Sequence, residues 1–188
     1  MATVRSVEKL VLMVGDVQAG VMQECANAAQ TIANVARTVE RARAAQVPVI
    51  WVQHESDELK RDSDAWQWVP ALVPAAGEAR VYKQFNSSFE QTNTDELLAQ
   101  AGVSHIVLAG AQSNWCIRAT AYGALERGYD LTLVKDAHTT SDLDLGNGTR
   151  IDAATIVRDL NVTMKWLQYP GRRNAVAAAE EVVFGATG

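Results

Sequence analysis

Short runs rich in apolar and branched side chains alternate along the chain with longer stretches of helical character. Apolar runs of this length are typical of strands that are covered on both faces of a sheet. We expect strands at residues 10–14, 49–52, 80–83, 105–109, 131–134 and 161–164.

Between these runs lie longer segments of helical character: residues 21–46 are Ala-rich and lack Gly and Pro, and two later segments end at the helix-stopping residues Gly102 and Gly128. We expect helices at residues 21–46, 94–101, 116–127, 149–160 and 174–183. Regular alternation of strands and helices predicts an α/β fold in which helices cover both faces of a mostly parallel sheet. We expect residues 1–188 to form a single domain. The long segment 54–78 is interpreted as a lid over a site or as an interface.

Composition narrows the functional classes. The 188 residues carry 17 Lys and Arg against 22 Asp and Glu, and the formal net charge of −5 disfavours nucleic acid or an anionic membrane as a partner. No apolar run approaches the ~20 residues of a membrane span, and the first residues lack a signal-peptide pattern. We therefore expect a cytoplasmic protein. Its two cysteines, Cys25 and Cys116, indicate neither a disulfide framework nor a cysteine-based zinc site.

Three reactive side chains fall at or just after the ends of predicted strands: Asp16, Lys83 and Cys116. Ligands of open parallel sheets bind beyond the carboxyl ends of the strands, so these side chains are expected to share one edge. A free thiol is only ~3% thiolate at neutral pH, and a helix start or a nearby lysine favours the anion. Cys116 can equally be a small buried residue on a helix, which is how we interpret Cys25.

Four segments in this order resemble the isochorismatase-like cysteine hydrolases, a family that includes nicotinamidases and N-carbamoylsarcosine amidases. The first is Asp16-Val17-Gln18 after an apolar strand, and the second runs from Lys83 to Phe89 as Lys-Gln-Phe-Asn-Ser-Ser-Phe. The third is a turn from Gly110 to Cys116 followed by Arg-Ala-Thr-Ala, and the fourth is Asp136-Ala137 after the fifth strand. The resemblance covers nearly the whole chain.

The resemblance implies a three-layer, six-stranded fold and a catalytic triad of Asp16, Lys83 and Cys116. Cys116 would attack a carbonyl carbon and form a thioester, Asp16 would carry the proton, and Lys83 would hold the two together. It also implies a cis peptide between Ala111 and Gln112, with the backbone N–H groups of Gln112 and Cys116 as the oxyanion hole. A homo-dimer or homo-tetramer is implied as well.

We predict that the substrate contacts Trp115, Phe89, Asn86, His54 and His138. The Asp-x-His metal motif of nicotinamidases is missing from residues 51–57, so we expect no metal and no other cofactor. The same departure makes nicotinamide a less favoured substrate than another small amide or ureido compound.

Two alternatives remain open from the sequence. An isochorismatase-type enzyme would hydrolyse a vinyl ether with Asp16 as the acid and would not require a cysteine. A non-catalytic oligomeric binding protein of the same fold would bury Cys116 as an unreactive residue. Neither the substrate nor the oligomeric state follows from the residues.

Overall fold

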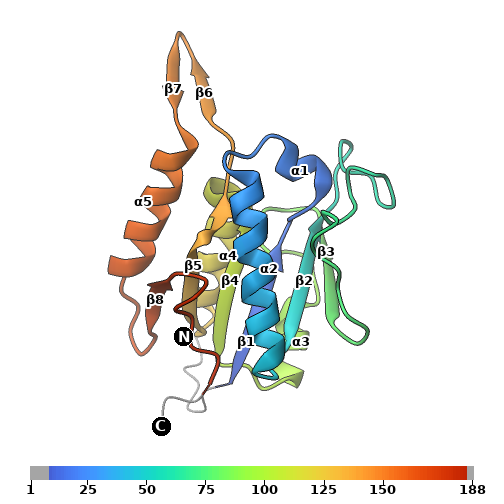
Figure 1. The fold of residues 1–188 in the computed structure, drawn as a ribbon. Coiled ribbons are helices and arrows are strands. Elements are labelled where there is room, and N and C mark those ends of the chain that lie inside the picture. The colour runs from blue at the N-terminus through green and yellow to red at the C-terminus, as the bar shows by residue number, and fades with distance from the viewer. Residues whose placement is uncertain (1–8, 186–188) are drawn as a thin grey trace.

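The computed structural model describes residues 9–185, and in this range the chain forms a six-stranded sheet in the order β3-β2-β1-β4-β5-β8 (Figure 1). Every pair of neighbouring strands in this sheet is parallel. The strands are β1 (Leu10–Gly15), β2 (Val49–His54), β3 (Ala79–Lys83), β4 (His105–Ala111), β5 (Asp130–Thr139) and β8 (Asn174–Ala177). The expected α/β sheet is confirmed.

Helices cover both faces of this sheet. They are α1 (Ala19–Gln23), α2 (Ala28–Ala44), α3 (Thr94–Gln100), α4 (Arg118–Glu126) and α5 (Ala153–Trp166), with a π-helical turn, η1 (Ser113–Ile117), before α4. Buried residues of α2 pack on one face, and buried residues of α3, α4 and α5 pack on the other. A two-stranded hairpin of β6 (Leu143–Gly146) and β7 (Thr149–Ile151) projects beyond the sheet before α5 (Figure 1).

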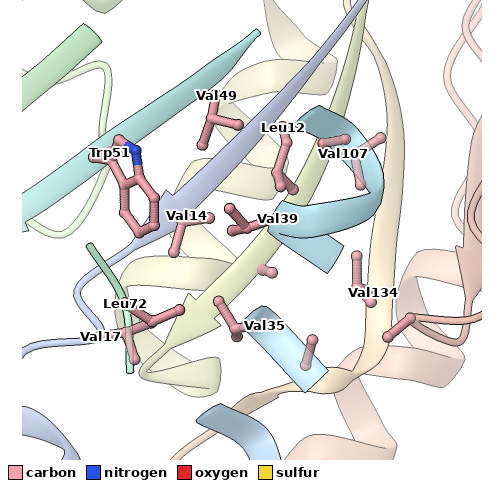
Figure 2. Close-up of a cluster of buried hydrophobic side chains, with 14 of the residues drawn as sticks. Leu12, Val14, Val17, Val35, Val39, Val49, Trp51, Leu72, Val107 and Val134 are labelled. Atoms are coloured by element: carbon pink, nitrogen blue, oxygen red, sulfur yellow. The ribbon is translucent and has the colours of Figure 1, made fainter. Parts of the chain in front are cut away.

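Strand β1 shows why the central strands have continuous apolar sequences. Leu12 and Val14 point into the cluster that contains Val35 and Val39 of α2 (Figure 2). The intervening Met13 lies in the cluster on the opposite face. Since successive side chains of a strand point to opposite faces, a strand covered on both sides needs an apolar residue at every position. Full burial of each such side chain is worth about 1.5–3 kcal/mol.

Three of the predicted elements differ in the structure. The helix expected at 21–46 is divided into α1 and α2, because Asn27 takes a left-handed conformation with φ 52° and interrupts the helical path. The strand expected at 161–164 is wrong: these residues belong to α5, where Ile156, Leu160 and Met164 form one buried stripe. The helix expected at 174–183 is also wrong, because residues 174–177 pair with β5 as the sixth strand and residues 178–183 are not helical.

The chain reverses its direction of travel across the sheet at β1. Strands β2 and β3 follow on one side of β1, whereas β4, β5 and β8 follow on the other side. Such a switch point leaves a crevice beyond the carboxyl ends of the two central strands. The strands approach closely there: a Cβ on Gly110 (φ 130°) would lie 2.0 Å from the carbonyl oxygen of Gly15. Glycine is therefore required at the end of β4.

Within residues 9–185, none of the helices combines the length and the apolar character needed to cross a bilayer.

Candidate active site

The three residues predicted as a triad meet at the carboxyl edge of the sheet. The Lys83 ammonium lies 2.7 Å from Oδ2 of Asp16 and donates a hydrogen bond of 3.2 Å to Sγ of Cys116. Lys83 and Asp16 are almost completely buried, at 2% and 1% exposure. An ammonium, a carboxylate and a thiol from three distant parts of the chain therefore share one contact cluster.

Each of the three is positioned by a different element. Lys83 is the last residue of β3, and Asp16 directly follows β1 with φ 55°, a left-handed conformation in which its backbone N–H donates to the Val52 carbonyl at 2.9 Å. Cys116 lies in the π-helical turn η1 after β4. The order β3-β2-β1-β4 brings these strand ends together along one edge.

A third acceptor completes the surroundings of the Lys83 ammonium. Nδ1 of His54, the last residue of β2, lies 3.2 Å from Lys83 Nζ. Asp16, Cys116 and His54 together match the three N–H donors of a lysine, which makes the burial of this charge tolerable. Burial lowers the pKa of His54, and Lys83 lowers it further. The imidazole is therefore neutral at neutral pH and accepts at Nδ1.

The electrostatic state of Cys116 differs from the sequence expectation. Burial raises the pKa of the thiol to about 12, and the adjacent Asp16 carboxylate adds to this effect, while Lys83 acts in the opposite direction. Burial also opposes the charge on Lys83, but Asp16 and Cys116 together raise the pKa of Lys83 above its usual value. At rest the site holds an Asp16–Lys83 ion pair beside a protonated thiol.

The backbone before Cys116 has the predicted cis peptide between Ala111 and Gln112. Gln112 precedes η1, and its carbonyl accepts hydrogen bonds from the backbone N–H groups of Trp115 and Ile117 at 3.1 Å each. Gln112 and Cys116 both line the cavity described next. Their role as an oxyanion hole stays a prediction.

Asp16 and Cys116 line a cavity of about 680 Å³. This volume falls within the usual range for small-molecule sites. His54, Asn86 and Trp115, which are three of the predicted substrate contacts, line it, and Trp115 is 48% exposed. The complete lining among the described residues is Asp16, Gly20, Val21, Gln23, Glu24, His54, Ser56, Glu58, Leu59, Ala65, Asn86, Gln112, Trp115 and Cys116.

Two predicted substrate contacts lie elsewhere. Phe89 is buried in the core, where its ring stacks on Tyr129 with centroids 6.3 Å apart. His138 is 2% exposed and lies in β5, because that strand continues beyond its predicted end at residue 134 to Thr139. Its side chain borders a second cavity of about 510 Å³ that does not include Cys116. The interpretation of both as substrate contacts is therefore corrected: Phe89 is a core residue and His138 is a buried structural group.

Several lining residues were missed. Glu24 ends α1, and Glu58 belongs to the segment between β2 and β3. Gln18, which was quoted only as part of a motif, fixes the backbone of His54: its side chain accepts from the His54 N–H at 2.8 Å and donates to the His54 carbonyl at 3.0 Å. The position of α1 directly after Asp16 is the sequence feature that could have placed Glu24 near the site. Among the described residues, no group of three or more His, Cys, Asp or Glu side chains is arranged to hold a metal ion.

Comparison with known proteins gives the family. A model of the isochorismatase domain matches residues 10–156, well over half of the chain. The chain belongs to the isochorismatase family. The fold agrees: an isochorismatase from Pseudomonas putida KT2440 superimposes with a TM-score of 0.83 at 26% identity, covering 96% of this chain and 94% of that one.

Two relatives show the extent of the similarity. The secreted isochorismatase effector Isc1 of Verticillium dahliae is 32% identical over 129 residues, which is 66% of this chain and 65% of the relative. Streptothricin hydrolase of Streptomyces noursei is 32% identical over 153 residues, which is 78% of this chain and 60% of that enzyme. The matches thus span somewhat less than two thirds of these isochorismatase-family relatives.

Proposed function

We propose that this isochorismatase-family chain is a cysteine hydrolase that cleaves a C–N bond of a small amide or ureido compound through a thioester on Cys116. The observation that carries the proposal is the contact of Lys83 Nζ with both Asp16 Oδ2 at 2.7 Å and Cys116 Sγ at 3.2 Å, in a cavity of small-molecule size. A carboxylate beside a protonated thiol is the arrangement that activates a nucleophile by general base catalysis.

In the first half-reaction Asp16 accepts the thiol proton while Sγ of Cys116 bonds to the carbonyl carbon, and the carbonyl electrons move onto oxygen. The backbone N–H groups of Gln112 and Cys116 are assigned to this oxyanion. As the intermediate collapses, Asp16 returns the proton to the leaving nitrogen and the C–N bond breaks. An amine departs and a thioester remains.

In the second half-reaction water attacks the thioester carbon and Asp16 accepts a proton from that water. The C–S bond then breaks, the thiolate takes the proton from Asp16, and a carboxylic acid is released. Lys83 opposes the build-up of negative charge on sulfur in each half. The high pKa of the resting thiol fits this scheme, because the proton that Asp16 must deliver to the leaving nitrogen comes from Cys116 itself.

The decisive experiment is turnover of a panel of small amides, with mass spectrometry of the intact protein for an acyl adduct. Cys116→Ala is expected to abolish both turnover and adduct. Cys25→Ser is the matched control, because Cys25 is buried and is not part of the cavity lining. Turnover that survives in Cys116→Ala would overturn the thioester route and favour the vinyl-ether reaction with Asp16 as acid.

Iodoacetamide labelling separates an enzyme from a non-catalytic binding protein. Cys116 is partly exposed and lines the cavity, whereas Cys25 is buried and lies outside the cavity lining. We expect faster labelling of Cys116 than of Cys25, measured on the digested peptides. Equal inertness of both thiols would contradict the hydrolase proposal. A homo-dimer or homo-tetramer, a single domain and a cytoplasmic location stay predictions.

A further inference from the structure

The wall of the catalytic cavity carries unbalanced negative charge. Glu24 and Glu58 both line it, and both are exposed. They come from separate segments, the end of α1 and the connection between β2 and β3. Neither glutamate takes part in an ion pair within the described residues, and the described lining of this cavity contains no Lys or Arg.

The other polar groups of the cavity do not offset these two charges. The carboxylate of Asp16 is neutralised by Lys83 at 2.7 Å. His54 lines the cavity as a neutral imidazole, because burial and then Lys83 lower its pKa. The unpaired charges that line the cavity are therefore the two carboxylates of Glu24 and Glu58. Their attraction for a bound cation is stronger in a concave site, because less screening water remains there than on a flat surface.

Basic side chains from the same connection lie outside the cavity. Lys60 and Arg61 border a neighbouring depression that excludes the triad. Arg61 contacts Glu55 at 3.6 Å and stacks over the Tyr82 ring at 4.1 Å from its centroid. These contacts hold the Arg61 guanidinium outside the cavity. An anionic group in the cavity would therefore find no basic partner among the lining residues.

Trp115 adds a feature that favours cations. It lines the cavity one residue before the nucleophile and is 48% exposed. The face of an indole ring attracts ammonium and guanidinium groups more strongly than other aromatic faces do. The two carboxylates and this exposed ring line the same cavity as Cys116.

We propose that the cavity selects amides that carry an ammonium or similar cationic group apart from the scissile carbonyl, with Glu24 and Glu58 as the residues that determine this preference. The inference rests on the proposed hydrolase function and names its substrate class. Carboxylate-bearing substrates, isochorismate among them, would meet repulsion and lack an arginine or lysine to pair with.

Kinetics with three amides of matched length test the preference directly. The set is 6-aminohexanamide, hexanamide and the monoamide of adipic acid, which differ only in a terminal positive, neutral or negative group. We expect kcat/KM to fall in that order. The spread should narrow as ionic strength rises from about 0.02 M to about 0.3 M, because salt screens exposed charges. Equal values, or a preference for the anion, would overturn the inference.

Charge-removing variants identify the residues responsible. Glu24→Gln and Glu58→Gln are each expected to reduce the cation-to-anion ratio of kcat/KM by about threefold to tenfold, the range for one partly screened charge. The double variant should approach the product of the two effects. Glu40→Gln on α2 is the matched control, since Glu40 is exposed but does not line this cavity, and its ratio should equal that of the parent.

A second measurement does not depend on turnover. Methanethiosulfonates bearing a trimethylammonium or a sulfonate group form a mixed disulfide with Cys116 and release methanesulfinate, and mass spectrometry of the digest gives each rate at this residue. We expect faster modification by the cationic reagent, with the difference reduced in the double Glu→Gln variant. Equal rates overturn the inference even if amides are hydrolysed. If the cationic reagent reacts faster but no amide is hydrolysed, the proposed hydrolase function is wrong, whereas the charge selectivity of the cavity still holds.

Discussion

The cavity that contains Cys116 and the cavity beside His138 differ in how their polar groups are partnered. In the first, of about 680 Å³, the thiol of Cys116 lies beside an ion pair, and Glu24 and Glu58 have no cationic partner among the described residues. In the second, of about 510 Å³, both ring nitrogens of His138 are engaged, with Ser113 Oγ at 2.8 Å and Asn161 Oδ1 at 3.0 Å. Unbalanced charge favours ligand binding, whereas a fully partnered network favours rigidity.

The two regions are joined through Ser113. This residue begins η1, the turn that carries Cys116, and its hydroxyl contacts His138 of β5. Asn161 of α5 continues the chain of contacts by donating to the Lys135 carbonyl at 3.0 Å. The hydrogen bonds around His138 therefore help to hold η1, the turn that carries Cys116.

The largest effect is expected from replacing Asp16, the proposed general base in the cavity of Cys116. In Asp16→Asn the neutral amide cannot accept the thiol proton, so kcat for any amide substrate should fall by about 10³-fold. Steady-state kinetics measures this loss, and circular dichroism checks that the fold is retained. An active Asp16→Asn variant would assign the proton transfer to another group.

The next largest effect is expected from replacing Lys83, the cation of the buried ion pair with Asp16. Lys83→Met leaves the carboxylate of Asp16 buried without its cation, which should cost about 3–5 kcal/mol in the free energy of unfolding. Urea titration measures it. The matched control is Lys135→Met, whose ammonium pairs with Glu181 at 3.2 Å on the surface and should contribute about 0–1 kcal/mol. A similar loss in both variants would contradict the importance of burial.

A pH-dependent effect comes from the second cavity. Burial lowers the pKa of His138 to about 4, although Asn161 and Asp136 act to raise it. An unfolded chain with an ordinary histidine pKa of about 6.5 binds the proton first, so stability falls as pH drops through the interval between these values. His138 should account for about 2 kcal/mol of the loss between about pH 7 and about pH 5.

His138→Gln provides the check on that interval. Urea titrations at both pH values should show a smaller pH-dependent loss in the variant, by the amount assigned to His138. The carboxyl groups titrate in both proteins and cancel in the difference. An unchanged dependence would show that the folded protein protonates His138 as readily as the unfolded chain does.

The smallest expected effect tests the link between the cavities. Ser113→Ala removes the hydroxyl that contacts His138 and should lower stability by about 1 kcal/mol. If Ser113 positions η1, kcat should fall by several-fold while KM changes little, and Ser113→Thr should restore activity. A loss of stability with unchanged kcat would restrict Ser113 to a structural role.

The sequence was most informative where both local pattern and chemistry agreed. Continuous apolar runs located β1, β2 and β4, and the parallel sheet then placed Asp16, Lys83 and Cys116 at one edge. The sixth strand was misplaced because Val162 and Met164 look strand-like alone, although Met164 completes a helical stripe with Leu160. Residues 174–177 contain two alanines, and only pairing with β5 makes them a strand.

Details of the cavity depended on tertiary structure. The fifth strand was predicted to end at residue 134, and the extension of β5 to Thr139 buries His138 instead. Phe89 lies near Asn86 in sequence, but its ring turns into the core beside Tyr129. Glu24 and Glu58 had no local signal, since an exposed glutamate in a helix or loop becomes part of a site only through its neighbours in space.

The assembly of the reactive cluster from β1, β3 and β4 has a consequence during synthesis and folding. β1 lies at the centre of the sheet, yet it cannot pair with β4 until more than half of the chain has been made. Before that pairing, Cys116 is not held beside Asp16 and lacks its contact with the Lys83 ammonium. The reactive cluster is therefore completed only after the segment that forms β4 and η1 has been synthesised.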